Sequence, residues 1–309
     1  MKKTDFTYNA ADGKEIFASK WEPEDTVKPK GLIQIVHGMA EHRHRYDEFA
    51  AFLTRAGFIC FGEDHRGHGE TITHPSEQGF FADDDGWNTV INDISLLTDK
   101  MIEEHPDLPV FIYGHSMGSL LSRTYLIKDP EKFAGVILTG TAAGQGVLGK
   151  IGKLVSRVEM RVKGPRTPSP LLDKLSFGAF NDAFKPNRTQ FDWLSRDDAK
   201  VDAYIKDPLC GFICTPNLFF NMIDGVEYIS AQGNVNTIPA DVPVFIASGA
   251  SDPVGGMGKG VEKVYNSYLK AGLKDVKMKL YPDSRHEILN ETNREEIYAD
   301  ILKWIKEKL

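Results

Sequence analysis

The segment Gly114-His115-Ser116-Met117-Gly118 has the residue types and the spacing of a serine nucleophile held on a sharp turn. It follows an apolar run and precedes a stretch with helical spacing, the context that distinguishes such a turn from a chance Gly-x-Ser-x-Gly match. Glycine is needed on both sides, because a serine in strained backbone geometry leaves no room for neighbouring Cβ atoms. The pattern therefore predicts that Ser116 is a nucleophile, and a plain glycine-rich corner between a strand and a helix is the alternative.

A serine hydroxyl is a weak nucleophile at neutral pH and needs a base, which an acidic residue orients. In α/β proteins with this turn, the partners follow along the chain in the order serine, acid, histidine. His286 is the only histidine after Ser116 and comes just after a strand-like run. It is therefore the predicted base.

Several aspartates could be the acid. Asp252 follows an apolar run and would lie at the carboxyl end of a buried strand, the edge of a parallel sheet where active sites form. Asp241 precedes the same run and would lie at the opposite edge, while Asp224 belongs to a long helical segment. Asp252 is thus favoured, with Asp283 as its rival because it stands only three residues before His286.

A second loop could bind the negative charge that develops on a substrate carbonyl. His37-Gly38-Met39 follows an early apolar run. The loop after an early strand supplies one of the two N–H groups of an oxyanion hole, the site that binds this negative charge. We expect the donors to be the backbone N–H groups of Met39 and Met117, although Gly38 could also be an ordinary turn glycine. The residues expected to contact the substrate are Gly38, His115, Phe177, Phe180, Phe219 and Val254.

The histidines near the N-terminal loops were weighed as a metal site. None of their spacings is the H-x-x-x-H pattern of a helical metal site, so we interpret them as loop hydrogen-bonding and surface residues, and we expect no metal and no other cofactor. The residues concerned are His37, His42, His44, Asp64, His65 and His68.

The elements that must position these residues alternate between strands and helices. Residues 5–21 alternate polar and apolar around Asp12-Gly13, which predicts a β-hairpin. Strands are predicted near 31–38, 57–64, 110–116, 135–141, 242–250 and 276–284, and helices near 47–57, 87–101, 120–126, 261–272 and 294–309. The sequence thus predicts an α/β fold with a mostly parallel sheet and an antiparallel start.

Residues 144–234 break this alternation. They contain no clear strand but several helical patterns, over a length far beyond an ordinary connection. We expect residues 1–143 and 235–309 to form the core, and residues 144–234 to form an inserted helical cap, or lid, over the carboxyl ends of the strands.

The composition excludes some classes of function. With 309 residues, a formal charge of −7 and no long block of Lys or Arg, the chain is not expected to bind nucleic acid. Three cysteines without a C-x-x-C pair, and no signal-peptide pattern near the N-terminus, favour a cytoplasmic location. The oligomeric state is left open.

Taken together, "HGMAEHRHRY", "DHRGHG", "GHSMGS" and "SGASDPVG" resemble the monoglyceride lipase and lysophospholipase-like branch of the α/β-hydrolases, which includes serine aminopeptidases. The resemblance covers nearly the whole chain and implies that Ser116, Asp252 and His286 form a catalytic triad. It also implies a small ester or lipid substrate. Whether the lid closes over this ligand or makes transient contact with a membrane surface is left open by the sequence. Two alternatives stay open: an aminopeptidase or amidase that uses the same triad, and a hydrolase-like binding protein without activity.

Overall fold

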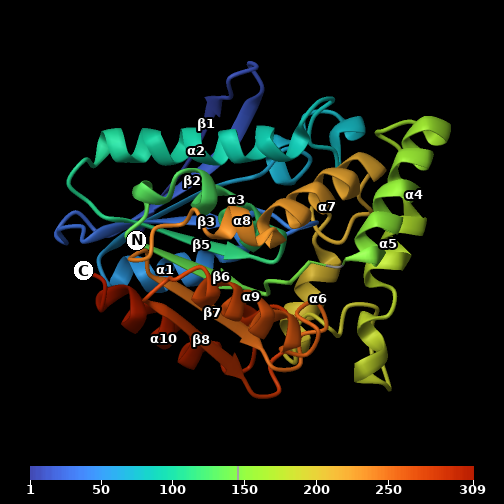
Figure 1. Ribbon diagram of the computed structural model, residues 1–309. Helices are drawn as coiled ribbons and strands as arrows, with labels where there is room; N and C mark the ends of the chain where they lie inside the picture. Colours follow the sequence, from blue (N-terminus) through green and yellow to red (C-terminus); the bar gives the residue numbers. More distant parts are fainter. Residues whose placement is uncertain (145) are drawn as a thin grey trace.

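The computed structural model describes residues 1–144 and 146–309, and its centre is an eight-stranded sheet in the order β1-β2-β4-β3-β5-β6-β7-β8 (Figure 1). β1 and β2 form an antiparallel hairpin, β2 pairs antiparallel with β4, and the pairs from β4 through β8 are parallel. The strands are β1 (Lys2–Asn9), β2 (Glu15–Glu22), β3 (Gly31–Val36), β4 (Phe58–Glu63), β5 (Val110–His115), β6 (Gly135–Thr139), β7 (Val244–Gly249) and β8 (Val276–Tyr281). The predicted α/β fold, with its antiparallel start, is confirmed.

Helices cover both faces of this sheet because its central strands are apolar on both sides. Side chains from α1 and α10 pack with Ile33 and Phe111 on one face, whereas α2, α3 and α9 pack with Leu32 and Ile112 on the other. These helices are α1 (Asp47–Arg55), α2 (Gly86–Glu104), α3 (Met117–Lys128), α9 (Lys259–Lys270) and α10 (Arg294–Lys306). Short 3₁₀ helices span Arg43–Tyr46, Gly69–Thr71, Pro75–Glu77, Pro130–Lys132, Phe180–Phe184 and Ile288–Asn290.

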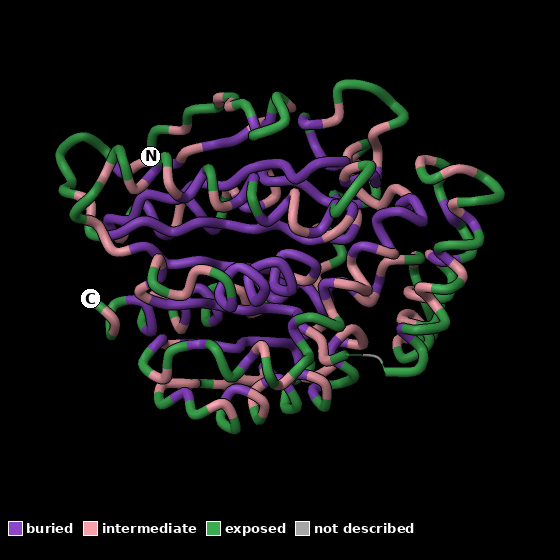
Figure 2. Tube along the Cα trace, turned by 45° about the horizontal axis from the view of Figure 1, so that its top comes forward, coloured by how far each residue is buried: buried purple, intermediate pink, exposed green. Residues whose placement is uncertain are grey.

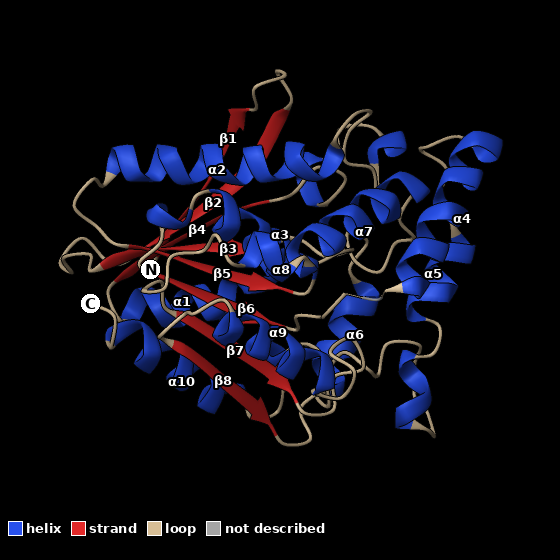
Figure 3. Cartoon of the chain, in the orientation of Figure 1, coloured by secondary structure: helices blue, strands red, loops and turns tan. Residues whose placement is uncertain are grey.

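The segment between β6 and β7 carries five more helices among its described residues. The first three lie beyond the carboxyl ends of the parallel strands, whereas the fourth packs beside α2 and α3 and the fifth beside α9 (Figure 3). They are α4 (Val147–Lys163), α5 (Pro170–Phe177), α6 (Asp198–Lys206), α7 (Pro216–Ser230) and α8 (Gln232–Val235). Helical spacing predicted α4, α5 and α7, whereas α6 and α8 were not anticipated. Gln145, which belongs to the expected insert, lies outside the described residues.

Local sequence explains where two of these helices begin. Ser169 accepts a hydrogen bond from the backbone of Leu172 at the start of α5, and Thr215 accepts one from Leu218 at the start of α7. In each case the cap is followed by a proline, whose missing N–H costs nothing at the first helical position.

The helix α7 packs on the core, while α4 lies at the outside of the molecule (Figure 2). A side chain at Gly225 of α7 would come within 2.1 Å of the Trp87 ring on α2, so the two helices touch closely there. None of the helices in the described part of the chain is long and apolar enough to cross a bilayer.

Candidate active site

Ser116 lies between the end of β5 and the start of α3, with a φ of 52° and a ψ of −122°. A positive φ is costly for a non-glycine residue and persists only where the surroundings enforce it. Here the backbone N–H of Ser116 donates to the carbonyl of Thr139 at the end of β6, at 2.9 Å. The turn thus projects a strained, half-buried serine at the carboxyl edge of the sheet.

The flanking glycines are required by the packing of this turn. A Cβ atom at Gly114 would lie 2.4 Å from the Ser122 hydroxyl, and one at Gly118 would lie 2.0 Å from the carbonyl oxygen of Val36. Real Cβ atoms do not approach other atoms this closely. The start of α3 therefore lies directly on the end of β3, which brings the loop after β3 to Ser116.

Asp252 and His286 are joined in the loops that follow β7 and β8. His286 Nδ1 lies 3.0 Å from both carboxylate oxygens of Asp252, and both residues are buried. The backbone N–H of Val254 donates to the Asp252 carboxylate at 2.9 Å and fixes its orientation. The rival acid, Asp283, is exposed and has no hydrogen bond to His286, so the structure pairs the histidine with Asp252.

Burial of His286 disfavours its charged form, but the charge and the hydrogen bond of Asp252 outweigh this effect and raise the pKa of the ring above its ordinary value of 6.5. Its neighbour His115 is also buried but has no comparable partner, and its pKa falls to about 3. At neutral pH, His115 is therefore an uncharged packing residue, and His286 is the ring prepared to carry a proton.

The serine, the histidine and the loop after β3 meet at one place. The rings of His115 and His286 are 4.8 Å apart, and a Cβ at Gly140 would lie 2.8 Å from His286 Cε1. A Cβ at Gly38 would lie 3.1 Å from the Cβ of Ser116. The predicted nucleophile, base and charge-binding loop are thus neighbours.

Two backbone N–H groups in the loop after β3 and at the start of α3 have no hydrogen-bond partner among the described residues. Glu41 Oε1 accepts the N–H of Gly38 at 2.5 Å, so that group is already used. Among the described residues no hydrogen bond is recorded for the N–H of Met39 in the loop, or for that of Met117 in the first turn of α3. These are the two donors that the sequence predicted.

Aromatic side chains of the insert form a cluster next to His286. Trp193 packs 5.2 Å from the His286 ring, and Phe177 stacks against Trp193 at 6.3 Å. Phe180 and Phe219 contact the same group, at 5.2 Å from Trp193 and 6.2 Å from Phe177 respectively. The structure thus gathers the three predicted phenylalanines around Trp193, another aromatic residue of the same segment, and its contact with His286 is not visible in the sequence.

The backbone also ties the insert to the loop of the base. The N–H of His286 donates to the carbonyl of Trp193 at 3.3 Å, and the N–H of Glu287 donates to that of Leu194 at 2.8 Å. Residues 193 and 194 therefore help to hold His286, although they belong to the segment between β6 and β7.

Behind the site, Arg45 bridges two buried carboxylates. Its guanidinium donates to Glu41 at 2.6 Å and to Glu287 at 2.6 and 2.7 Å. Glu287 is buried, which would raise its pKa, but Arg45 reverses this and holds the pKa at about 2. Because Glu41 also binds the Gly38 N–H and Glu287 follows His286, this ion-pair network connects the two loops of the site. It was missed in the sequence because Arg45 and Glu287 are far apart along the chain.

The other N-terminal histidines take part in loop contacts. The rings of His37 and His65 stack at 3.9 Å, and His37 Nε2 accepts the N–H of His65 at 3.0 Å. Burial lowers the pKa of both rings, and that of His68 as well. These three histidines support the loops after β3 and β4.

Comparison with known proteins identifies the family of this chain. Residues 27–293 match the family described as serine aminopeptidase, S33. The chain belongs to this family. It is 28% identical to human monoglyceride lipase over 304 residues, which cover 96% of this chain and 89% of that protein. It is 25% identical to monoacylglycerol lipase of Mycolicibacterium smegmatis, over 98% of this chain and 97% of that one.

Solved structures agree with this assignment. A highly thermostable carboxyl esterase from Bacillus coagulans, in complex with glycerol, superposes with a TM-score of 0.90 at 29% identity and covers 99% of this chain and 98% of its own. The monoglyceride lipase-like resemblance and the α/β-hydrolase fold expected from the sequence are confirmed.

Replacing Arg45 tests the buried network. Arg45→Met leaves Glu41 and Glu287 buried without their cation, and we expect the free energy of unfolding to fall by about 3–5 kcal/mol in denaturant titrations near neutral pH. Lys185→Met is the control, because it breaks only the exposed pair with Asp182 and should leave stability unchanged. Equal stabilities of Arg45→Met and the parent protein would show that the network does not hold the loops.

Proposed function

We propose that this protein is a serine hydrolase that cleaves carboxylic esters through an acyl-enzyme, with Ser116, His286 and Asp252 as its catalytic triad. The observation that carries the proposal is the strained Ser116 beside a buried His286 whose Nδ1 is held by Asp252. The names of the esterase and lipase relatives support the same reaction class.

In this mechanism, the Ser116 hydroxyl attacks the ester carbonyl carbon while His286 takes its proton. The carboxylate of Asp252 is hydrogen-bonded to Nδ1, so Nε2 is the nitrogen that accepts this proton, and Asp252 stabilises the resulting cation. The N–H groups of Met39 and Met117 bind the oxyanion of the tetrahedral intermediate. His286 then returns the proton to the leaving alcohol, and water releases the acid from Ser116 by the same steps.

We propose a monoacylglycerol or a lysophospholipid with a medium or long acyl chain as the substrate. The aromatic cluster of Phe177, Phe180, Trp193 and Phe219 lies next to His286 and offers apolar contacts for such a chain. On this proposal, Gly38, His115 and Val254 surround the reacting ester, and residues 144–234 form the cap that selects the substrate. The chemistry requires no cofactor, and a cytoplasmic location stays a prediction from the sequence.

The helix α4 supports the further proposal that the cap docks on a membrane surface. One side of α4 exposes a row of aliphatic side chains, with Leu148 71% and Val162 76% exposed. An exposed apolar stripe of this size marks an interaction site, and an apolar face flanked by cations is typical of helices that lie in a lipid interface. The exposed aliphatic residues are Val147, Leu148, Ile151, Leu154, Val158 and Val162, and the cations of α4 are Lys150, Lys153, Arg157, Arg161 and Lys163.

An aminopeptidase activity is the second candidate, and it depends on a carboxylate that could bind a substrate ammonium group. Glu159, Asp182 and Asp192 are already engaged with other protein groups. Asp173 is partly buried, has no ion pair among the described residues, and has a pKa raised by burial. It also lies one turn before Phe177 on α5, which makes it the carboxylate of the insert that is best placed for this role.

Covalent labelling separates these activities from a binding protein. We expect a fluorophosphonate probe to label the parent protein and to leave Ser116→Ala unlabelled, because only an activated serine hydroxyl attacks the phosphorus. We expect p-nitrophenyl decanoate to be hydrolysed with a higher kcat/KM than the acetate. Ser119→Ala is the control, since its hydroxyl donates to the Ser116 carbonyl and would not react.

Two outcomes of these assays would change the proposal. A parent protein that is folded but not labelled would contradict catalysis. Turnover of aminoacyl-arylamides without ester turnover would favour the aminopeptidase, and Asp173→Asn should then raise KM for substrates with a free amino group.

The raised pKa of His286 predicts the pH dependence. His286 must be neutral to accept a proton, so kcat/KM should fall as the pH drops through its pKa, with a midpoint above 6.5. Asp252→Asn removes the charge that raises this pKa, so the midpoint should move to lower pH and kcat should fall by about 10³–10⁴-fold. Asp283→Asn is the matched control, and a larger effect from this variant would make Asp283 the acid.

Vesicle binding tests the docking of α4. We expect the parent protein to sediment with vesicles that contain anionic phospholipid, less so at high salt, and the Leu148→Glu/Leu154→Glu variant to stay in the supernatant. Leu96→Glu and Leu269→Glu, on α2 and α9, carry the same change at exposed positions away from this face. Unchanged sedimentation of the α4 variant would contradict docking, and a concentration-dependent dimer that it abolishes would assign the face to a second copy of the chain.

A further inference from the structure

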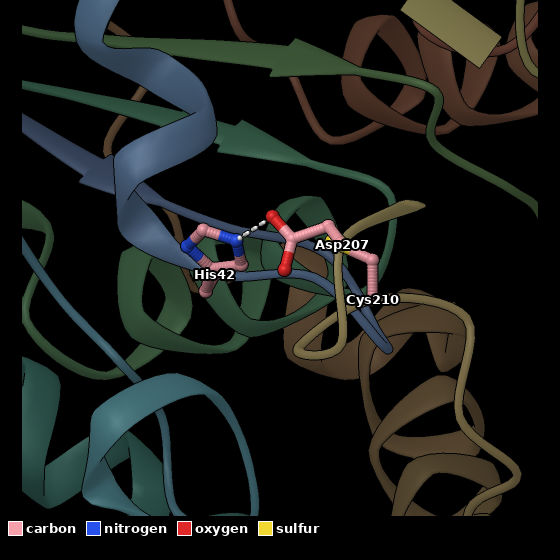
Figure 4. A group of neighbouring side chains, drawn as sticks. All are labelled: His42, Asp207 and Cys210. Atoms are coloured by element: carbon pink, nitrogen blue, oxygen red, sulfur yellow. Dashed lines mark hydrogen bonds and ion pairs between the residues drawn. The ribbon is translucent and has the colours of Figure 1, made fainter. Parts of the chain in front are cut away.

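A histidine, an aspartate and a cysteine meet where the insert touches the loop after β3, outside the proposed triad (Figure 4). A ring nitrogen of His42, a carboxylate oxygen of Asp207 and the Sγ of Cys210 all lie within 4.8 Å of one another. Figure 4 shows the imidazole and the carboxylate facing each other, with Cys210 beside them on the loop after α6. The three side chains offer one nitrogen, one oxygen and one sulfur donor to a common point.

The backbone holds these donors in place. The N–H of Gly211 donates to the carbonyl of Ala40 at 2.9 Å, and the Tyr204 hydroxyl donates to the same oxygen at 3.1 Å. The loop itself is closed by the N–H of Cys210, which donates to the Asp207 carbonyl at 3.1 Å. Two hydrogen bonds to the Ala40 carbonyl thus hold the segment of Asp207 and Cys210 against the loop that carries His42.

The ring of His42 is not fully satisfied by this packing. His42 is 5% exposed, its Nε2 lies 2.8 Å from Asp207 Oδ2, and its Nδ1 has no hydrogen-bond partner among the described residues. The hydrogen bond turns Nε2 toward Asp207 and Cys210, so Nε2 is the ring nitrogen that can bind an ion there, while Nδ1 points away from the cluster.

The donor set selects the kind of ion. A cysteine thiolate with an imidazole and a carboxylate suits Zn²⁺ and similar transition metals, whereas Mg²⁺ and Ca²⁺ need sites built from oxygen. Three protein ligands leave a fourth position for water, and the Asp207 side chain is 30% exposed, so solvent can reach the ion.

We propose that His42, Asp207 and Cys210 form a binding site for Zn²⁺ or a similar transition-metal ion, which clamps the insert to the loop that carries Met39. On binding, the Cys210 sulfur forms a bond to the metal and the thiol proton passes to solvent. The oxidation states of sulfur and metal do not change, so no oxidant is needed. The ion takes no part in the proposed hydrolysis. It links two segments that are more than 160 residues apart in the sequence, because both supply ligands to the same ion.

Metal titration without substrate tests this site independently of the hydrolase proposal. The chelator-treated, reduced protein is titrated with ZnCl₂ in a calorimeter, and with CoCl₂ while its absorption spectrum is recorded. We expect one ion per chain, a thiolate-to-cobalt charge-transfer band in the near ultraviolet, and a higher midpoint of thermal unfolding with Zn²⁺. Absence of stoichiometric binding by the parent protein overturns the proposal, whatever its esterase activity.

Variants assign the binding to these three side chains. Cys210→Ser should abolish the charge-transfer band, and His42→Gln and Asp207→Asn should each weaken Zn²⁺ binding by at least about tenfold, the smallest loss seen when even an outer partner of a metal site is removed. Cys214→Ala and His74→Gln are the controls, because both residues lie outside the cluster and should leave the titration unchanged. Circular dichroism confirms that each variant is folded, and folded variants of the cluster that bind like the parent protein overturn the site.

Discussion

The close contact between the start of α3 and the end of β3 is the constraint on which the site depends. Gly118 lies so near the carbonyl of Val36 that no side chain fits between them. This contact fixes α3 on the sheet, forces the positive φ of Ser116, and brings Gly38 against the serine. The strain at Ser116 is offset by the hydrogen bond to Thr139 and by the packing of α3, so a stable core maintains a costly conformation at its edge.

A second set of contacts gives the base its position, and part of it comes from the insert. His286 is held by Asp252 on one side, while its backbone and that of Glu287 donate to Trp193 and Leu194. Arg45 then joins Glu287 to the loop after β3 through buried ion pairs. Buried charges of this kind are strongly coupled to their partners, so a shift of one loop would be resisted by the other.

Much of this arrangement could be predicted from the sequence, because its signals are local. The turn at Ser116 is recognised from five consecutive residues, the strands from apolar runs, and the base from being the only histidine after Ser116. Asp252 was favoured over Asp283 by its place after a strand, and the structure pairs Asp252 with His286. In each case one segment carries the information.

Contacts between distant segments could not be predicted in this way. The spacing in α4 indicates a helix, yet it does not say whether the apolar face is covered, and the structure leaves that face exposed. The pairing of Arg45 with Glu287, and of His42 with Asp207, depends on the path of the whole chain, since ion-pair partners carry no mark of each other in the sequence. The sequence accordingly groups these histidines with one another and with Asp64, and carries no sign that Asp207 and Cys210 lie beside His42.

The same backbone contacts that position His286 have a consequence for how this fold changes its specificity. Trp193 both packs on the imidazole and belongs to the aromatic cluster that we propose for the acyl chain, so the insert contributes to the base and to the substrate site at once. Substitutions at the outer members of the cluster, such as Phe180, can alter apolar contacts without reaching the base. Changes at residues 193–194 alter both, because the carbonyl oxygens that hold the His286 loop lie in the segment that we propose to contact the substrate. Substitutions that alter substrate preference should therefore disturb His286 least at the outer residues of the insert. They should disturb His286 most at residues 193–194, which contact the loop after β8.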